Sequence, residues 1–431
     1  MICNNLSVNE EGHLAFAGVD VVDMAKKYGT PLMLMDEAKI REKMTIYRES
    51  MKECFTEDSM PLFASKALSF KYIYKIANSE NIGIDCVSAG EIYTAVQAGF
   101  PMEKAYFHGN SKTENEIRYA MECGVGHFVC DSVEEVSVID EIAHSMGIVQ
   151  KILLRITPGI DPHTHKKIST GSVDSKFGVA IETNQAYELV RGTLALKNIE
   201  LSGYHCHIGS QIFEYDPFCD AVRIMIKFIA DTRDMFGYTA KELNLGGGMG
   251  VRYTKDDPEI DYRANIKGIA DLMRTLCSEY SLEMPRILME PGRSIVADAG
   301  MTLYTAGYLK EITGLKNYIS IDGGMTDNPR FTLYQSPYTV LLANRMNENS
   351  DYKCTIAGRC CESGDIIQED VMMPKPSRGD IIAVLTTGAY NYAMASHYNK
   401  VPKPCVVMLT DGKDHIVIKR ETYADMISNE V

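Results

Sequence analysis

Short apolar runs that alternate with helical stretches constrain the fold of this chain more than any other feature. Eight such runs are found: Pro61–Lys66, Ile82–Ser88, Lys104–Gly109, His127–Asp131, Lys151–Thr157, Leu201–Ile208, Glu242–Gly247 and Arg286–Glu290. The segments between them, such as Gly90–Gly99 and Phe218–Phe236, carry apolar residues at helical intervals, which predicts parallel βαβ units. Eight repeats favour a TIM-like (β/α)8 barrel over a doubly wound sheet, which more often has about six strands. An open sheet remains the alternative.

The pattern changes after about residue 294. The later runs are short, β-branched and separated by turn residues: Tyr318–Asp322, Tyr338–Ala343, Tyr352–Ala357, Asp380–Thr387, Cys405–Leu409 and His415–Lys419. This predicts an all-β domain, like a sandwich or barrel, built from hairpins. Leu6–Asn9 and His13–Phe16 could add strands to it. We therefore predict an α/β barrel over residues 30–293 and a β domain over residues 1–29 plus 294–431.

The charge balance excludes some classes of partner. The 431 residues carry 44 basic and 58 acidic side chains, a net charge of −14. Nucleic acids and anionic membranes need a basic face, so neither is expected as a partner. The twelve cysteines form no C-x-x-C pair, and no secretory signal or membrane-length apolar run is seen, so we expect free thiols in a reducing cytoplasm and no metal site.

Reactive side chains recur at the carboxyl ends of the predicted barrel strands. They are Lys66, Asp85, His108, Arg155, His207, the glycines Gly246 to Gly248, and Glu290. Functional groups of eight-stranded barrels collect at this end. Seven coincidences of this kind predict an active site there.

Lys66 and the glycine run could bind opposite ends of one ligand. A lysine after Phe63-Ala64-Ser65 could form a Schiff base, although a solvated lysine at a strand end is the ordinary alternative. Gly246, Gly247 and Gly248 could turn backbone amides toward a phosphate, which TIM barrels commonly bind after strands seven and eight. A simple tight turn is the alternative for the glycines.

Glu290 and His207 could contact a flat ring. A carboxylate at position 290 could pair with the ring nitrogen of pyridoxal phosphate, or form a salt bridge at the barrel end. The imidazole of His207 could stack on the ring, and Ser210 could donate to a phosphate oxygen. His205 and His207 share one strand face, so a metal site is a competing interpretation, but no third ligand lies close in sequence.

The second domain offers further candidates. Arg330 and Tyr334 are four residues apart and would share one face of a helix. Cys361 offers a thiol acid beside the carboxylate of Glu362, and Tyr390 offers a phenol. A buried structural thiol is the ordinary alternative for Cys361.

These motifs together resemble the fold-type III pyridoxal-phosphate decarboxylases, and within them the diaminopimelate decarboxylases. The matching segments run in family order along nearly the whole chain: HGNSK (108–112), HIGSQ (207–211), GGG (246–248), EPGR (290–293), CESGD (361–365) and GAYNYAMASHYN (388–399). One departure is Leu68, where many members have asparagine, so the pocket wall beside Lys66 can differ.

The resemblance implies a role for each matching residue. Lys66 would form the Schiff base with pyridoxal 5′-phosphate, and His207 would stack on the ring. Glu290 would pair with the pyridine nitrogen. Ser210 and the glycine run would hold the phosphate. Further cofactor contacts are expected from Arg155, Gly246, Gly247, Gly248, Gly292, Arg293 and Tyr390.

The resemblance also implies a substrate and an assembly. Arg293, Arg330, Tyr334 and Tyr390 would bind substrate, Cys361 would supply a proton, and Glu362 would hold the distal amine. Cys361 would enter the site from the partner of a homodimer. The expected reaction is decarboxylation of meso-diaminopimelate to L-lysine. The alternatives are a decarboxylase of ornithine, lysine or arginine, an amino-acid racemase, and an inactive regulator.

Overall fold

The computed structural model describes residues 1–160 and 176–431. The chain divides into two compact units. The first consists of Met1–Glu42, Val251–Glu259 and Arg293–Val431, and the second consists of Lys43–Gly250 and Ile260–Gly292.

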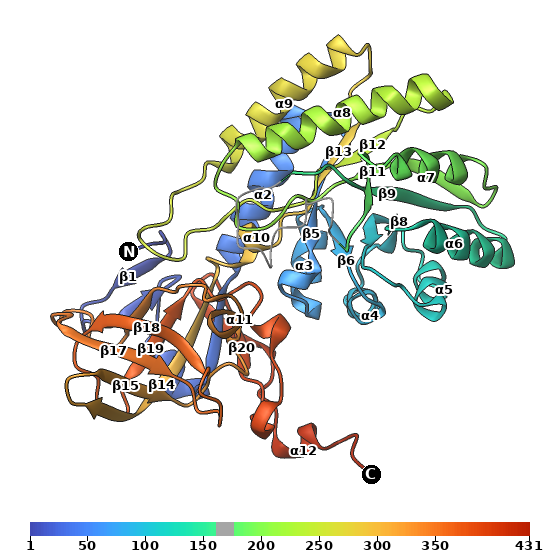
Figure 1. The fold of residues 1–431 in the computed structure, drawn as a ribbon. Coiled ribbons are helices and arrows are strands. Elements are labelled where there is room, and N and C mark those ends of the chain that lie inside the picture. The colour runs from blue at the N-terminus through green and yellow to red at the C-terminus, as the bar shows by residue number, and fades with distance from the viewer. Residues whose placement is uncertain (161–175) are drawn as a thin grey trace. The chain divides into compact units, whose positions relative to one another are not determined.

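The second unit contains a closed barrel of eight parallel strands (Figure 1). They are β5 (Met60–Ala64), β6 (Gly83–Cys86), β7 (Ala105–Phe107), β8 (His127–Cys130), β9 (Gln150–Thr157), β11 (Ile199–His205), β12 (Glu242–Asn244) and β13 (Arg286–Met289). Each strand pairs with the next along the chain, and β13 pairs with β5 to close the ring. The predicted barrel is therefore confirmed, and each strand overlaps its predicted run.

Helices join successive barrel strands on the outside of the ring (Figure 1). They are α3 (Lys71–Ser79), α4 (Ala89–Gln97), α5 (Glu114–Glu122), α6 (Val133–Met146), α7 (Gln185–Leu194), α8 (Asp216–Phe236) and α9 (Tyr262–Glu279), while α2 (Glu37–Cys54) precedes β5. Several start at a residue that caps backbone amides. The side chains of Ser88, Thr113 and Ser132 accept hydrogen bonds from the third residue of α4, α5 and α6.

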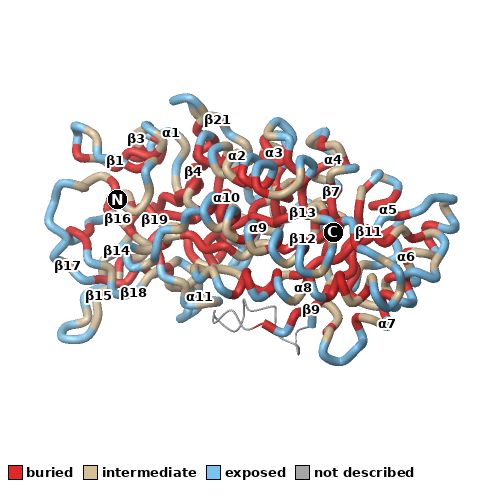
Figure 2. The backbone as a smooth tube through the Cα atoms, turned by 90° about the horizontal axis from the view of Figure 1, so that it is seen from above, coloured by how far each residue is buried: buried red, intermediate tan, exposed pale blue. Residues whose placement is uncertain are grey.

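Apolar side chains fill the barrel interior. Leu62, Tyr106, Val129, Leu153 and Leu288 form one buried cluster, with one residue from each of five strands. Figure 2 shows the barrel strands as buried segments and the outer helices with exposed faces. The interior is thus a packed core, and any ligand must bind at an end of the barrel.

The first unit is built on a mixed sheet, ordered β18-β17-β15-β14-β4-β20-β21; β19 also pairs with β14, and β16 pairs with β19. Its strands are β4 (Leu32–Asp36), β14 (Gly300–Ile312), β15 (Lys316–Ile321), β16 (Val340–Leu342), β17 (Tyr352–Ala357), β18 (Ile366–Met373), β19 (Ile381–Leu385), β20 (Cys405–Thr410) and β21 (Lys413–Ile418). The predicted hairpins are found at β14–β15, β17–β18 and β20–β21. The pairs β15–β17 and β4–β20 are parallel, which the hairpin prediction did not include.

The N-terminal segment also belongs to the first unit. It forms a small sheet of β1 (Leu6–Val8), β2 (Leu14–Phe16) and β3 (Val19–Asp20), followed by α1 (Val21–Tyr28). Leu14 and Phe16 are buried in one core with Leu303 and Val407. The predicted contribution of this segment to the β domain agrees with that packing.

Two short segments depart from the predicted barrel range of residues 30–293. β4 lies in the mixed sheet because it pairs with both β14 and β20, and Val251–Glu259 also clusters with the first unit. Where the chain divides into independently folding domains stays a prediction. Within the described part of the chain, every helix is too short or too polar to cross a bilayer.

Candidate active site

The barrel carries reactive side chains where its strands end, as predicted. Lys66 lies in the 3-10 turn Ser65–Ala67 directly after β5, and His108 directly follows β7. Glu290 directly follows β13, and His207 lies two residues beyond β11. Since all eight strands are parallel, these positions share one end of the ring.

Glu290 is the centre of a buried polar cluster. Asn244 Nδ2 donates to its Oε1 at 2.7 Å, and His205 Nε2 lies 3.3 Å from its Oε2. His108 Nε2 lies 2.8 Å from Oε1. Burial alone would raise the pKa of Glu290, but the two histidines outweigh it and hold the pKa well below its usual value. Glu290 is therefore an anionic acceptor in a water-poor site.

Of the two histidines, His205 forms a hydrogen bond with that carboxylate, and His108 lies at ion-pair distance from it. Burial lowers the pKa of His205 to about 4, so its imidazole is neutral near pH 7 and can donate through only one nitrogen. His108, His205 and Glu290 also have the chemistry of a metal-ligand set, and their ligand atoms lie within 4.8 Å of one another. Their mutual contacts already account for this arrangement, and the expected absence of a metal stays a prediction.

The glycine run forms a turn into which no side chain fits. A Cβ at Gly246 would lie 2.5 Å from Cys206 O, and one at Gly247 would lie 2.2 Å from Glu290 O. Gly246 has φ +68° and Gly248 has φ +120°, both in the left-handed region. The turn therefore packs directly on the backbone that carries Glu290 and on the segment after β11.

His207 and Ser210 lie in the segment that pairs with this turn. Gly247 N–H donates to His207 Nδ1 at 3.2 Å, and Ile212 N–H donates to Gly248 O at 2.9 Å. Burial lowers the pKa of His207 well below its usual value, so its ring is neutral with the proton on Nε2. The structure thus brings the HIGSQ and GGG motifs together, as a phosphate site shared by both motifs requires.

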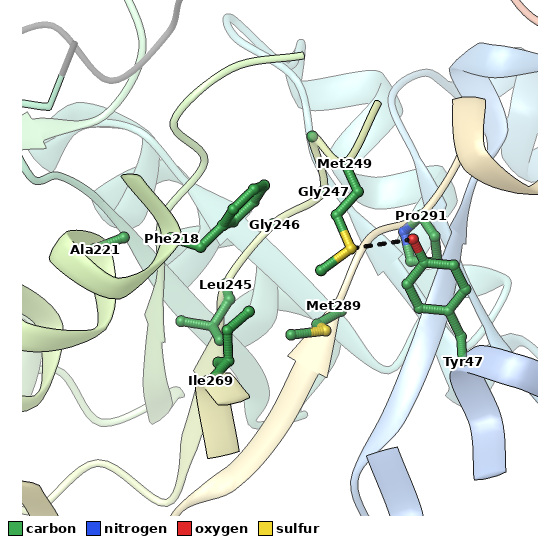
Figure 3. Close-up of a pocket in the computed structure, with 11 residues that line it drawn as sticks. Tyr47, Phe218, Ala221, Leu245, Gly246, Gly247, Met249, Ile269, Met289 and Pro291 are labelled. Carbon is green, nitrogen blue, oxygen red and sulfur yellow. Dashed lines mark hydrogen bonds between the residues drawn. The ribbon is translucent and has the colours of Figure 1, made fainter. Parts of the chain in front are cut away.

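An apolar pocket lies next to the glycine turn (Figure 3). Its lining includes Phe218, Leu245, Ile269 and Met289, and Tyr47 Oη donates to Met249 Sδ at 3.6 Å. An apolar lining does not suit an anionic phosphate. We therefore assign this pocket to the packing that supports the turn.

A substitution in the turn tests its role. Gly247→Ala is expected to weaken cofactor binding by about tenfold or more, because its Cβ would displace the turn or the Glu290 backbone by an amount that costs roughly 1–3 kcal/mol. Titration of the cofactor into apoprotein, followed by absorbance, measures this change. Gly192→Ala is the control, since Gly192 lies in helix α7, has no left-handed φ, and its Cβ would meet no atom within 4 Å. Equal cofactor affinity of wild type and Gly247→Ala would contradict the assignment.

Lys66 and Asp85 share the same end of the barrel. Asp85 is fully buried, and among the described residues neither of its carboxylate oxygens has a hydrogen-bond partner. Burial raises the pKa of Asp85, and charges of His108 and Lys66 oppose the rise. The Lys66 ammonium is therefore within electrostatic range of a carboxyl group. Gly292 lies against this turn, since its Cβ would lie 2.9 Å from Ala64 Cβ.

Arg155 lies two residues before the end of β9, and, besides burial, its charge helps to lower the pKa of His207. Its Nε is 3.8 Å from Asp131 Oδ1, and its guanidinium lies 4.5 Å from the centre of the Phe177 ring. It remains a predicted cofactor contact.

The first unit holds the predicted substrate arginines. Arg330 begins the predicted helix, α11 (Arg330–Tyr334), and its side chain is buried. It donates to Tyr338 Oη at 2.9 Å and lies 4.4 Å from the centre of the Tyr253 ring. Arg293 donates to Tyr253 Oη at 2.8 Å. The two guanidinium groups therefore share Tyr253 as a neighbour, which gives a cationic patch bounded by phenols.

Tyr390 also belongs to this group, whereas the place of Tyr334 in it stays a prediction. Arg293 lies 4.7 Å from the centre of the Tyr390 ring. Tyr334, at the end of α11, is half-buried, and so is Tyr390. The structure thus places Arg293 and Tyr390 together, as their shared predicted role requires.

Cys361 and Glu362 are exposed in a loop of the first unit. Thr332 Oγ1 in α11 donates to Gly364 O at 2.9 Å, so this loop lies beside the helix that begins with Arg330. Cys361 is exposed, so the alternative of a buried structural thiol does not apply to it. Most of the other cysteines are buried.

Several neighbours of the site were not predicted from the sequence. Asn244, Tyr253 and Tyr338 were not candidates, and neither was Asn391, whose Nδ2 donates to Tyr338 Oη at 3.1 Å. His108 was named only at a strand end and in the HGNSK motif. Asn244 could have been found from its position, because it ends β12 and β12 pairs with β13, which Glu290 follows. Tyr253 has no such signal in the sequence.

The chain is similar to known proteins over nearly its whole length. Residues 37–297 match the family described as pyridoxal-dependent decarboxylase, pyridoxal binding domain. A diaminopimelate decarboxylase of Bacillus subtilis is 43% identical over 97% of this chain and 95% of its own length. One of Staphylococcus aureus is 42% identical over 98% of each chain. The chain belongs to the diaminopimelate decarboxylase family.

A solved structure agrees with that membership. A diaminopimelate decarboxylase of M. jannaschii in complex with L-lysine has a TM-score of 0.90, with 32% identity over 99% of this chain and 98% of its own. The cofactor of this pyridoxal-dependent decarboxylase family is pyridoxal 5′-phosphate. The residues present suit that group: a lysine amine, a flat neutral imidazole, a glycine turn without room for a Cβ, and an anionic acceptor.

Proposed function

We propose that this protein decarboxylates meso-diaminopimelate to L-lysine and carbon dioxide, the last step of lysine biosynthesis, with pyridoxal phosphate as cofactor. Its relatives of 37–44% identity are diaminopimelate decarboxylases, and a structural neighbour binds L-lysine, the product of that reaction. The observation that carries the chemistry is the buried carboxylate of Glu290 with its three polar neighbours.

The barrel residues would hold and tune the cofactor. When bound, pyridoxal phosphate supplies a protonated ring that accepts the electron pair released as carbon dioxide leaves. Lys66 would attach the cofactor covalently, and Glu290 would keep the ring nitrogen protonated. His207 would lie against the ring face, while Ser210 and the glycine amides would bind the phosphate.

The residues of the first unit would bind the substrate. Diaminopimelate carries a carboxylate and an ammonium at its far end, so it needs a cationic and an anionic partner. Arg330 and Arg293 offer planar donors for carboxylates, and Glu362 offers an acceptor for the ammonium. Tyr334 and Tyr390 would add phenol contacts. Cys361 would return a proton to the carbon that lost carbon dioxide.

The assembly and the compartment belong to the same proposal. The exposed positions of Cys361 and Glu362 suit a homodimer in which each subunit lends this loop to its partner's site. All twelve cysteines are free, which suits a cytoplasmic enzyme.

Carbon dioxide release from purified holoenzyme tests the activity and its substrate. We expect kcat/KM for meso-diaminopimelate to exceed that for lysine, ornithine or arginine by about 10³-fold or more, because these amino acids leave a buried substrate arginine without its carboxylate. Comparable turnover of any of them would contradict the substrate assignment. Racemisation without carbon dioxide release would favour the racemase, and lack of a visible cofactor absorbance would favour the inactive regulator.

A further inference from the structure

The loop that carries Cys361 is held by a second segment of the first unit. We propose that Asn399 is a positioning residue: its side chain fixes the backbone of Cys361 and thereby sets the direction of the thiol. This inference rests on the proposed role of Cys361 as a proton donor. It gives a function to the Tyr398–Asn399 end of the 388–399 motif, to which the sequence interpretation assigned none.

Asn399 bonds directly to the backbone of the loop. Its Oδ1 accepts a hydrogen bond from Cys361 N–H at 2.7 Å. The neighbouring Tyr398 Oη donates to Cys361 O at 3.5 Å. Both polar groups of the Cys361 backbone are therefore held by adjacent residues of one short segment, and the rotation of the peptide units around its Cα is restricted.

The backbone of Asn399 is shaped for this contact. Its φ of 53° and ψ of 22° lie in the left-handed region, which asparagine, aspartate and glycine adopt more readily than other residues. The residue type thus matches two requirements at once: an acceptor on a short side chain and a left-handed backbone. Glycine would satisfy only the second, and aspartate would satisfy both.

The other end of the loop is anchored in the interior. Asp365 is 2% exposed, and its carboxylate accepts hydrogen bonds from Cys360 N–H at 2.7 Å and Met325 N–H at 2.6 Å. A Cβ at Gly358 would lie 2.2 Å from this carboxylate, so the chain passes close against it. Asp365 fixes the path of the loop as far as Cys360, and the contact with Asn399 fixes the next residue, which bears the thiol.

The direction of the thiol matters because proton transfer depends steeply on geometry. A donor must lie within hydrogen-bond reach of the atom that it protonates, and a misplacement of about 1 Å can cost roughly 10²-fold in rate. An exposed loop without such restraints would spread the thiol over several positions. The hydrogen bond from Cys361 N–H narrows that spread without contact between Asn399 and the reacting atoms.

Three variants separate the acceptor from the backbone conformation. Asn399→Gly keeps the left-handed backbone and removes the acceptor, and we expect kcat to fall about tenfold with KM and cofactor absorbance unchanged. Asn399→Asp keeps both, and we expect it to recover most of kcat. Asn184→Gly is the control, because Asn184 is an exposed left-handed asparagine (φ 61°) at the start of α7 whose side chain makes no capping hydrogen bond.

A double-mutant cycle with Cys361→Ala decides whether Asn399 acts through the thiol. In the Cys361→Ala background, Asn399→Gly is expected to lower kcat by less than twofold further. An equal loss of kcat in both backgrounds, an unchanged kcat in Asn399→Gly, or failure of Asn399→Asp to recover would each overturn the inference. If Cys361→Ala itself keeps full kcat, the proposed function of Cys361 fails instead, which is a different result.

Discussion

Replacing Lys66 by alanine is expected to remove the activity and the covalent attachment of the cofactor together. Lys66 lies in the turn after β5, at the same end of the barrel as Glu290, His207 and the glycine turn. Loss of a nucleophilic amine that the reaction passes through should lower kcat by roughly 10⁴-fold or more. Carbon dioxide release with meso-diaminopimelate measures the rate, and the visible absorbance after borohydride treatment and dialysis measures covalent attachment.

Lys71→Ala is the matched control for Lys66→Ala. Lys71 begins α3 five residues further on, and it is exposed. Lys71→Ala should therefore keep wild-type kcat and absorbance. Retention of a borohydride-fixed cofactor by Lys66→Ala would show that another amine holds it. Melting temperatures of the two variants should agree within a few degrees, because the side chain of Lys66 is only half-buried.

The barrel could be predicted from the sequence because each of its strands is marked by a local sequence pattern. Each of the eight strands is a short apolar run bounded by turn residues, and each starts within two residues of the start of its predicted run. β4 could not be assigned in this way. Leu32–Asp36 is a fully buried run before a helix, just like a first barrel strand, but it pairs with β14 and β20. Membership of a sheet is decided by partners far away in the chain.

The residues of the candidate site also differ in how far the sequence predicts them. Strand-end residues such as Lys66 and Glu290 could be found from periodicity, because parallel strands bring their ends together. Their detailed roles came from the family resemblance and stay predictions. Tyr253 could not be found, since its position between Arg293 and Arg330 depends on contacts 40 and 77 residues apart in the chain. The anionic state of Glu290 also required the structure, because it depends on histidines from two other strand ends.

Replacing Glu290 by glutamine is expected to leave the cofactor bound but catalytically weak. A neutral amide cannot hold the ring nitrogen in its protonated form, so the ring accepts the electron pair less well as carbon dioxide leaves. Removal of one such electrostatic contribution typically costs about 10²–10³-fold in kcat. In the wild type the pKa of Glu290 is held well below its usual value, so its charge does not change between pH 6 and 9. Over that range the ratio of wild-type to variant kcat should therefore stay constant.

Glu242→Gln is the control variant. It removes a buried carboxylate charge elsewhere in the barrel, so it shows how much kcat falls when a buried charge is lost away from the ring nitrogen. Glu242 is also a buried carboxylate of β12, but it lies at the opposite end of that strand from the glycine turn, where it accepts from Arg286 Nη1 at 2.8 Å and Tyr106 Oη at 3.2 Å. Its loss leaves Arg286 short of a partner and should lower the melting temperature. It should leave kcat within about twofold, because the described hydrogen-bond partners of Glu242 are Arg286 and Tyr106, and neither is a predicted cofactor residue. Equal kcat losses in both variants would mean that Glu290 acts through barrel stability and not through the ring nitrogen.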